Sequence, residues 1–371
     1  MTPEVLIVGA GVIGCACAHE LAAAGARVSV FDARQAGKGA SQASAGVLAP
    51  YIEGHEAGPL RELGARSLGM YDRFVQHAMR TSGLTVQYTR NGTLEMAYRH
   101  DAVERLCQSA GTLSAQGVRA EWLEGPALRA AEPLVTSAVK GGLLIANHGF
   151  VGVPDLVDAL AASAMRNGAT FALDTRVVAI DHGPGGRIAV ETENGVSFGD
   201  AVVIATGSWT SQLRVADADR ASVKPIRGQL LHLSWPTAQP LRHVLWGPGC
   251  YLVPWLTGRV LVGATMEDVG FDERATAVGV KDLLEAAGTL VPELWKAAFT
   301  EVRVGLRPAS TDGLPIVGAS AMVPGVIYAT GHYRNGVLLA PLTAALVKDL
   351  VFGHGTDPAL AMLSPGRFGK L

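Results

Sequence analysis

The hydrophobic pattern at the start of the chain predicts one strand–helix–strand unit. The apolar run Val5–Val8 is short and is followed at once by glycines, which is typical of a buried parallel strand. A helix is expected over residues 11–24, and Gly25 is its predicted end. The β-branched alternation of residues 27–31 then predicts a second strand that ends at Asp32.

The same periodicities predict helices and strands along the rest of the chain. Helical spacing of apolar residues predicts helices over 58–82, 154–167, 278–290 and 335–352. Strands are predicted at 92–97, 141–145, 201–204, 229–233, 250–253, 259–262 and 325–329, with a hairpin about 183–186. Those between 223 and 265 are expected to be antiparallel. Because no repeat or long charged linker divides the chain, two interleaved regions are expected.

Composition narrows the class of protein. A chain of 371 residues, 49% of them hydrophobic, is long enough for two closely connected domains. A formal net charge of only -2 leaves no electrostatic footprint for nucleic acid or anionic lipid, so neither is an expected partner. The apolar N-terminus is interrupted by glycines and charged residues and lacks a basic region before it, which predicts no signal peptide and no membrane span.

The cysteines favour a reducing, cytoplasmic location. Cys15, Cys17, Cys107 and Cys250 form no C-x-x-C pair and are too sparse to staple a chain of this size. The sequence also contains no Ser/His/Asp nucleophile motif, no Walker loop and no His/Cys cluster with metal-ligand spacing. A bound cofactor is therefore expected to supply the chemistry, and no metal site is predicted.

The turn Gly9-Ala10-Gly11-Val12-Ile13-Gly14 follows the first predicted strand and opens the first predicted helix. Glycines there allow a tight turn and a close backbone approach, and the helix N-terminus offers N–H groups to a pyrophosphate. Asp32, at the end of the next strand, suits hydrogen bonds from a ribose diol. Strand, turn, helix and acid in register predict a dinucleotide site.

This motif leaves NAD and FAD open, and the rest of the chain favours FAD. The small-residue loop 39–46 follows Asp32 where an NAD-binding domain would continue with further βαβ units. The sequence Ala205-Thr206-Gly207 after an apolar strand offers a second close approach of backbone to a large cofactor. Read by itself, it equally fits an ordinary turn at the end of a strand.

Seven segments carry a resemblance to a known family: 8–14 with Asp32, 41–48, 205–209, 251–254, 262–266, 305–308 and 331–336. Together they resemble the D-amino-acid-oxidase superfamily of flavoenzymes, and within it the bacterial glycine-oxidase group of the thiamin pathway. The last three segments are the most specific. The resemblance implies an α/β (α+β bilobal) fold, in which a Rossmann-like FAD-binding domain is interleaved with an antiparallel-sheet substrate domain.

The resemblance also implies domain boundaries and a cofactor site. The FAD-binding domain is expected to comprise 1–84, 150–217 and 303–371, and the substrate domain 85–149 and 218–302. The expected FAD-binding residues are Gly9, Gly11, Val12, Ile13, Gly14, Asp32, Ala33, Ser41, Ser44, Ala45, Gly46, Val47, Leu48, Val177, Ala205, Thr206, Gly207, Trp209, Arg307, Tyr333, Arg334, Asn335, Gly336, Val337 and Leu338. Relatives with covalent flavin attach it through a cysteine near the C-terminal glycine turn, and no cysteine follows Cys250 here, so FAD is expected to be non-covalent.

Arg307 and Tyr251 are the expected substrate clamp. A guanidinium suits the bidentate recognition of an amino-acid carboxylate, and Arg307 matches the family motif that supplies this clamp, with the Tyr251 hydroxyl as its partner. Outside that motif, an arginine is more often a structural charge and a tyrosine a core residue. Arg334 is expected either to contact substrate or to pair with a carboxylate, and His332 is expected to be structural.

The family mechanism needs no side-chain base. A neutral amine transfers hydride from its α-carbon to flavin N5, the imine hydrolyses to an oxo acid, and dioxygen becomes hydrogen peroxide. The backbone of 331–336 and the N-terminus of the following helix would stabilise the reduced flavin anion. The expected substrate is a small amino acid or amine such as glycine, sarcosine or a D-amino acid, and a homo-oligomer is possible.

Two other functions are compatible with the sequence. One is an amino-acid or iminodicarboxylate dehydrogenase that passes electrons from FAD to a quinone or a protein instead of dioxygen. The other is a non-catalytic FAD-binding subunit of a larger amine dehydrogenase, against which the pair Arg307 and Tyr251 argues. Oxygen consumption distinguishes the first from an oxidase, and amine-dependent dye reduction by the purified chain would exclude the second.

Overall fold

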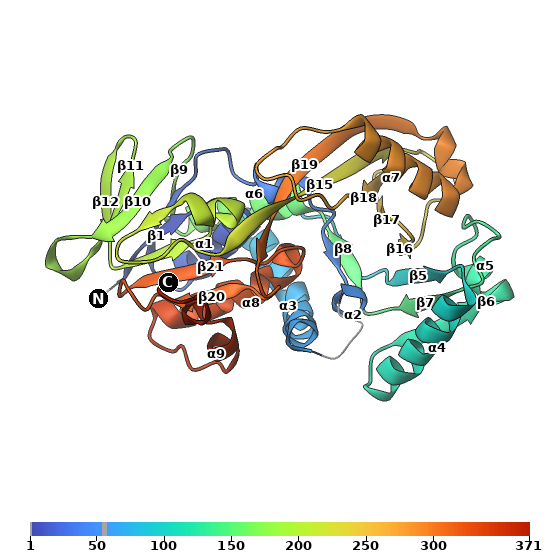
Figure 1. Ribbon diagram of the computed structural model, residues 1–371, viewed down its shortest axis with the longest axis horizontal. Coiled ribbons are helices and arrows are strands. Elements are labelled where there is room, and N and C mark those ends of the chain that lie inside the picture. The colour runs from blue at the N-terminus through green and yellow to red at the C-terminus, as the bar shows by residue number, and fades with distance from the viewer. Residues whose placement is uncertain (1, 54–57) are drawn as a thin grey trace.

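A six-stranded sheet forms the centre of one half of the molecule, on the left in Figure 1. The computed structural model describes residues 2–53 and 58–371. The strand order is β20-β21-β13-β1-β2-β9, and neighbouring strands are parallel except for the antiparallel pair β20 and β21. Their bounds are β1 Glu4–Val8, β2 Arg27–Phe31, β9 Thr170–Ala172, β13 Ala201–Ile204, β20 Ile316–Ala319 and β21 Val326–Thr330.

Helices cover one face of this sheet and a small second sheet covers the other. In β1, Val5 and Ile7 pack into the helical core, whereas Leu6 and Val8 pack against the second sheet, because successive strand residues face opposite sides. The helices are α1 Val12–Ala23, α3 Pro59–Ser82, α6 Val153–Arg166 and α8 Gly336–Val351. The second sheet consists of β10 Val177–His182, β11 Ile188–Thr192, β12 Gly195–Gly199 and β14 Arg214–Val215.

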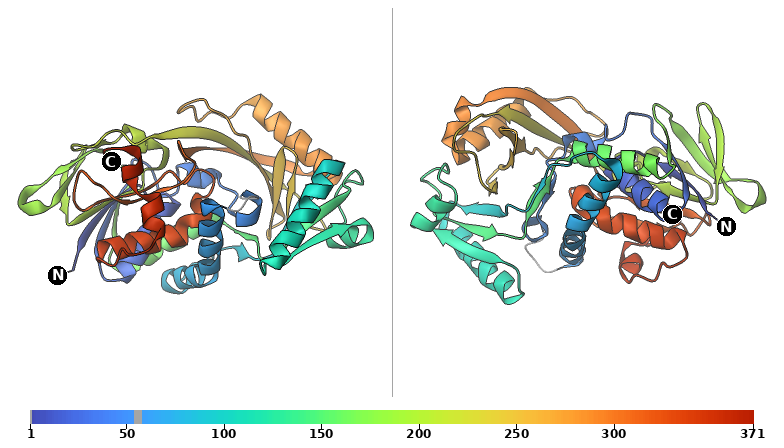
Figure 2. Two further views of the ribbon diagram at one scale, coloured as in Figure 1. Left: turned by 60° about the horizontal axis from the view of Figure 1, so that its bottom comes forward. Right: turned by 180° about the vertical axis from the view of Figure 1, so that it is seen from behind.

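An eight-stranded sheet forms the other half, and in both views of Figure 2 the two halves lie side by side. Its order is β19-β15-β18-β17-β16-β5-β7-β6, and all neighbours are antiparallel except β16 and β5. The strands are β5 Thr93–Ala97, β6 Ala120–Glu124, β7 Gly141–Ile145, β15 Val223–Ser234, β16 Val244–Gly247, β17 Cys250–Trp255, β18 Arg259–Gly263 and β19 Ala298–Ser310. Helices α4 His100–Ala115, α5 Gly125–Ala131 and α7 Ala277–Leu290 accompany them.

A three-stranded sheet lies between the halves, and its strand order is β3-β8-β4. Strand β8 pairs with both β3 and β4. The bounds are β3 Val47–Leu48, β4 Tyr88–Thr89 and β8 Gly149–Val151, and the remaining helices are α2 Pro50–Glu53 and α9 Ala359–Leu363. Strands β3 and β4 lie on the passage of the chain from β2 of the six-stranded sheet to β5 of the eight-stranded sheet, and β8 lies on the return passage from β7 to β9.

The predicted fold class is confirmed. A parallel sheet with helices and a mostly antiparallel sheet are both present, and every predicted helix and strand has a counterpart within a few residues. The hairpin predicted about 183–186 joins β10 to β11. Two large elements were not predicted: α4, and the full length of β19, in which Pro308 pairs opposite Pro225 of β15. The predicted domain division stays a prediction, and its boundary at 302/303 falls within β19.

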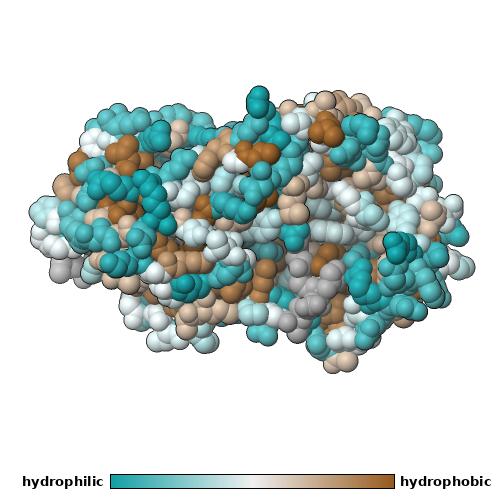
Figure 3. Space-filling view, in the orientation of Figure 1, coloured by the Kyte–Doolittle hydropathy of each residue, from teal (hydrophilic) through white to brown (hydrophobic). Residues whose placement is uncertain are grey.

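None of the helices in the described residues is both long enough and apolar enough to cross a membrane. On the face drawn in Figure 3, hydrophobic residues form separate small patches within a mainly hydrophilic surface. Exposed apolar side chains such as Met266, Phe271 and Val278 belong to the segment before and at the start of α7.

Candidate active site

A cavity of about 890 Å³ opens at the carboxyl edge of the parallel sheet. Val8 and Phe31 end two neighbouring strands, Ala205 follows a third, and all three residues line the cavity. Open parallel sheets bind ligands at this edge. The opposite wall comes from the eight-stranded sheet and includes Tyr251 of β17 and Arg307 of β19. The cavity therefore lies between the two large sheets.

Most of the residues predicted for the site line this one cavity. Those that do are Gly9, Gly11, Val12, Ile13, Asp32, Ala33, Ser41, Ser44, Ala45, Gly46, Val47, Val177, Ala205, Thr206, Gly207, Trp209, Tyr251, Arg307, Tyr333, Arg334, Asn335, Gly336, Val337 and Leu338. They come from distant parts of the chain, so the fold brings them together. Their individual roles toward a cofactor or substrate stay predictions.

Gly14 and Leu48 were predicted to contact the cofactor, but neither lines the cavity. Gly14 has a packing role, because a Cβ there would lie 1.8 Å from the carbonyl oxygen of Gly9. The Leu48 side chain has an exposed fraction of 0% and packs into the helical core. Its neighbour Val47 lines the cavity instead, since successive strand residues point to opposite faces.

The glycine turn combines two different requirements. Gly9 has a φ of +110°, and a Cβ there would lie 2.4 Å from the carbonyl oxygen of Ala205, so the turn itself demands glycine. A Cβ at Gly11 would meet only Ser41 Oγ, at 3.4 Å, among the described atoms. The fold alone therefore tolerates a small side chain at Gly11. The space beside Gly11 belongs to the cavity, where a ligand could approach the backbone closely.

The N-terminus of α1 and the Asp32 carboxylate face the same part of the cavity. Helix α1 begins after Gly11, and the Val12 N–H donates to Ser41 Oγ at 3.0 Å. The other N–H groups in the first turn of a helix lack intrahelical partners. Asp32 Oδ2 accepts from the Ala10 N–H at 2.6 Å and Oδ1 accepts from the Arg34 N–H at 2.8 Å. Burial raises the pKa of Asp32, while these N–H donors counteract it. Each carboxylate oxygen retains a lone pair for a hydroxyl donor.

The N-terminus of a second helix, α8, also reaches the cavity. Asn335 is its N-cap residue, and Gly336, Val337 and Leu338 of its first turn line the cavity. His332, just before it, is buried and its Nε2 lies 2.9 Å from Thr343 Oγ1. Burial lowers the pKa of His332 to about 3, so the imidazole is neutral. With His332 neutral, the positive groups of this wall are the N-terminus of α8 and the Arg334 side chain, which also lines the cavity.

The Arg307 guanidinium is seated on the backbone of neighbouring strands. Its Nη1 donates to the carbonyl oxygen of Thr265 at 2.9 Å and to that of Arg227 at 3.4 Å. Gly228 of β15 leaves room beneath it, since a Cβ there would lie 2.3 Å from Arg307 Nη2. Glycine within a strand often marks such a close approach. The seat fixes one edge of the guanidinium against backbone.

The Tyr251 ring has a seat of the same kind. Tyr251 pairs with Gly263 across β17 and β18, and a Cβ at Gly263 would lie 2.3 Å from the ring carbon Cζ. Trp246, opposite Tyr251 on β16, lies on its other side with ring centroids 5.0 Å apart. Trp246 also lines the cavity. The Tyr251 ring is thus confined between a backbone seat and an indole.

Several cavity residues were not identified from the sequence. Arg34 holds Glu273 through Nη1 and Nη2 at 3.0 and 2.7 Å, and its guanidinium lies 4.6 Å from the Trp209 ring centroid. Its position two residues after Asp32 was the available signal. Gly228 and Gly263, which support Arg307 and Tyr251 from behind, directly precede and directly follow the predicted strands 229–233 and 259–262, and a glycine beside a strand is a recognised sign of close backbone packing. Trp246 carried no signal apart from its nearness to Tyr251.

A family model described as FAD-dependent oxidoreductase matches residues 4–350. The chain therefore belongs to the FAD-dependent oxidoreductase family and is an enzyme of this class. It is similar to the glycine oxidase of Geobacillus kaustophilus, with 35% identity over 370 residues that cover 99% of this chain and 98% of the relative. The crystal structure of glycine oxidase from Geobacillus kaustophilus superposes with a TM-score of 0.93 and 34% identity, covering 99% of both chains.

Two other relatives extend the comparison. The bifunctional protein ThiO/ThiG of Nostoc is 35% identical over 100% of this chain, which spans 56% of that longer protein. The crystal structure of iminodiacetate oxidase from Chelativorans gives a TM-score of 0.86 at 27% identity and covers 98% of this chain and 99% of that one. The predicted resemblance to the D-amino-acid-oxidase superfamily, and to glycine oxidases within it, is confirmed.

Proposed function

We propose that the protein oxidises a small amino acid or an N-substituted glycine at the carbon that carries the nitrogen, with dioxygen as the electron acceptor. The product is an imine, which water hydrolyses to an oxo acid, and the two electrons reduce dioxygen to hydrogen peroxide. The proposal rests on the family, on the glycine-oxidase relatives, and on Arg307, an arginine of the cavity wall that forms no ion pair with a carboxylate of the described residues.

The uncompensated charge of Arg307 is the observation that carries the proposal. Its hydrogen bonds go to neutral carbonyl oxygens, and no carboxylate of the described residues forms an ion pair with it. Arg34 and Arg227, by contrast, are paired with Glu273 and with Glu267. A cation that lines a cavity without its own counterion favours an anionic ligand, and a guanidinium binds a carboxylate in a bidentate manner. We infer that Arg307 binds the substrate carboxylate, with Tyr251 beside it.

The cavity also suits the cofactor of the family. The N-terminus of α1 would hold the pyrophosphate, Asp32 would accept from a ribose diol, and the space beside Gly11 would admit the ligand. The N-terminus of α8 would stabilise negative charge at the other end of the cavity. FAD, when bound, supplies the acceptor for the hydride. We propose that it is held without a covalent bond. Among the described residues Cys250 is the only cysteine that lines the cavity, and it is buried, which raises its pKa to about 12.

The protein then contributes orientation and exclusion of water. Arg307 and the confined Tyr251 ring fix the carboxylate end of the substrate, so that the nitrogen-bearing carbon has one approach to the cofactor. The relatives named glycine oxidase and iminodiacetate oxidase support a substrate with nitrogen next to a carboxymethyl group. The ThiO/ThiG relatives support a place in thiamin biosynthesis.

Anaerobic flavin bleaching tests the proposal. Glycine, sarcosine, D-alanine, D-proline and iminodiacetate are added one at a time to the purified holoenzyme, with lactate and glycolate as controls without nitrogen. At least one amine is expected to bleach the flavin band faster than either hydroxy acid, and admission of air should restore the band with formation of peroxide. Faster bleaching by a hydroxy acid would overturn the proposed substrate class. If an amine bleaches the flavin but the reduced flavin consumes no oxygen when air is admitted, the protein is a dehydrogenase instead.

A further inference from the structure

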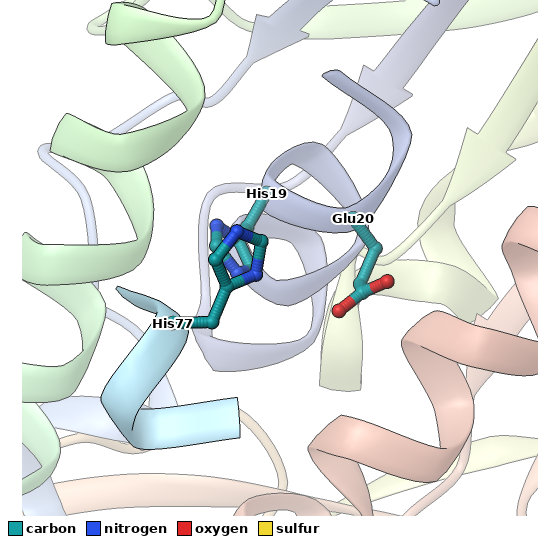
Figure 4. A group of neighbouring side chains, drawn as sticks. All are labelled: His19, Glu20 and His77. Carbon is teal, nitrogen blue, oxygen red and sulfur yellow. The ribbon is translucent and has the colours of Figure 1, made fainter. Parts of the chain in front are cut away.

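Three side chains that are common metal ligands meet at the end of α1 remote from the cavity. His19 and Glu20 belong to α1 and His77 belongs to α3, and one potential ligand atom from each lies within 4.8 Å of the others. Figure 4 shows both imidazoles overlapping in the view, with the Glu20 carboxylate extending beside them. Residues 11–13, at the other end of the same helix, line the cavity. The cluster is thus separate from the site described above.

His19 is a buried histidine with one unsatisfied nitrogen. Its side chain has an exposed fraction of 0%, and Nδ1 lies 2.8 Å from Ser163 Oγ of α6. Nε2 is buried and has no hydrogen-bond partner among the described residues. The His77 ring lies beside it, with ring centroids 4.7 Å apart. A buried polar atom without a partner is costly and calls for an explanation.

The environment of His19 prepares it as a ligand. When Nδ1–H donates to Ser163, the lone pair is on Nε2, which is the arrangement found for metal-bound histidines whose other nitrogen is hydrogen-bonded.

Glu20 is the anionic side chain of the cluster, and Lys348 already forms an ion pair with it. One of its oxygens, Oε2, accepts from Lys348 Nζ of α8 at 2.8 Å, and the carboxylate is about one-fifth exposed. The second oxygen remains for another cation. His77 is half-buried, so water can reach the cluster from the surface. Lys348 is the positive group whose charge opposes cation binding here.

We propose that His19, Glu20 and His77 bind a divalent cation of the zinc class, with water as the fourth ligand. Two imidazoles and one carboxylate form a ligand set that zinc accepts. Zinc–nitrogen distances near 2.0–2.1 Å in a tetrahedron place ligand atoms about 3.4 Å apart, so the ligand atoms would draw together by up to about 1.4 Å. Rotation of the half-buried His77 and of Glu20 provides this movement. The bound ion would link α1 to α3 in the helical layer and satisfy His19 Nε2.

Titration with Zn²⁺ tests the site on metal-free holoenzyme without a histidine tag. Calorimetry should show one saturable site per chain, and the melting temperature should rise with Zn²⁺ and return after chelation. His77→Gln should weaken binding at least about tenfold. Lys348→Met should tighten it, because the variant removes the cation that competes for Glu20. His354→Ala, which changes an exposed histidine outside the cluster, is the matched control and should bind as the wild type does.

His77→Gln is the main variant because its half-buried position makes folding less sensitive than a change at buried His19 would be. Its melting temperature without metal checks that it is folded. Absence of a saturable site in the wild type would overturn the proposal. Equal affinity of the His77→Gln and wild-type proteins, or weaker binding by Lys348→Met, would also contradict it. None of these measurements depends on the reaction proposed above.

Discussion

Replacing Gly228 by alanine should displace the Arg307 guanidinium without removing it. A Cβ at Gly228 would lie 2.3 Å from Nη2 and 2.4 Å from Cζ and Nη1 of Arg307. Ordinary contacts between such atoms are about 3.5 Å. The guanidinium must therefore retreat by about 1 Å. The hydrogen bond from Nη1 to the Thr265 carbonyl oxygen, now 2.9 Å, would be lost or remade elsewhere.

The expected damage falls on catalysis more than on folding. The displaced atoms are the end of a flexible side chain, so the free energy of unfolding should fall by no more than one lost hydrogen bond, about 0.5–1.5 kcal/mol. A misplacement of about 1 Å in a group that positions the substrate can lower the rate by on the order of 10²-fold. We therefore expect kcat/KM to fall roughly 100-fold in a protein that remains folded and yellow.

Anaerobic stopped-flow reduction with the best amine substrate measures this effect. The flavin spectrum and the melting temperature report whether Gly228→Ala still binds FAD and folds. Gly69→Ala is the matched control, because Gly69 is an exposed helical residue with no described atom within 4 Å of an added Cβ. It should keep full activity and gain about 0.4–1 kcal/mol of stability. If Gly228→Ala retained wild-type kcat/KM, Arg307 would not be the substrate clamp.

Three further predictions follow from the same structure. Arg307→Ala should weaken transition-state stabilisation by about 2–4 kcal/mol, which lowers kcat/KM roughly 30- to 900-fold. Tyr251→Phe should lower kcat/KM only a few-fold to about tenfold. If stopped-flow flavin reduction across pH found the tyrosine variant more damaged than the arginine variant, both the clamp and the base-free mechanism would be rejected. Gly11→Val should fold but lose FAD, and Gly14→Val should damage the fold itself, because its Cβ would meet a backbone oxygen at 1.8 Å; circular dichroism and flavin content separate the two. Burial raises the pKa of Glu267, but hydrogen bonds to its carboxylate outweigh burial and lower the pKa to about 2. The contribution of Glu267 to the free energy of unfolding should therefore be present above about pH 4.5 and lost as the pH falls toward 2. Urea unfolding of Glu267→Gln should show a flatter pH dependence than the wild type between these pH values.

The parts of the fold that sequence predicts well depend on local rules. The first strand, glycine turn and helix are determined by an apolar run, by conformations that only glycine adopts easily, and by a helix that is buried along most of its length. Helix α4 was missed although Leu106, Ala110 and Leu113 give it an apolar stripe. Its polar remainder weakened the pattern.

Strand β19 shows where local rules fail. Pro308 argues against a continuous strand, yet β19 runs through it from Ala298 to Ser310. The strand is at the edge of the sheet, where a missing N–H donor is tolerated, and Pro308 stands opposite Pro225 of β15. Edge position and a partner so distant in sequence depend on tertiary structure, which no local pattern contains. The same holds for Gly228, whose seat for Arg307 depends on that pairing.

The arrangement of arginines explains why one position in the cavity can select for an anion. Arg227 is buried and held by Glu267 at 2.5 Å and Asp272 at 3.0 Å, so its charge is cancelled within the protein. The same network positions Thr265, because Thr265 Oγ1 donates to Glu267 at 2.6 Å. The Thr265 carbonyl then accepts from Arg307. The ion pair of Arg227 and Glu267 thus helps to position the backbone that holds Arg307. Carbonyl dipoles orient the Arg307 charge without cancelling it, which is why we propose that this charge binds a substrate carboxylate.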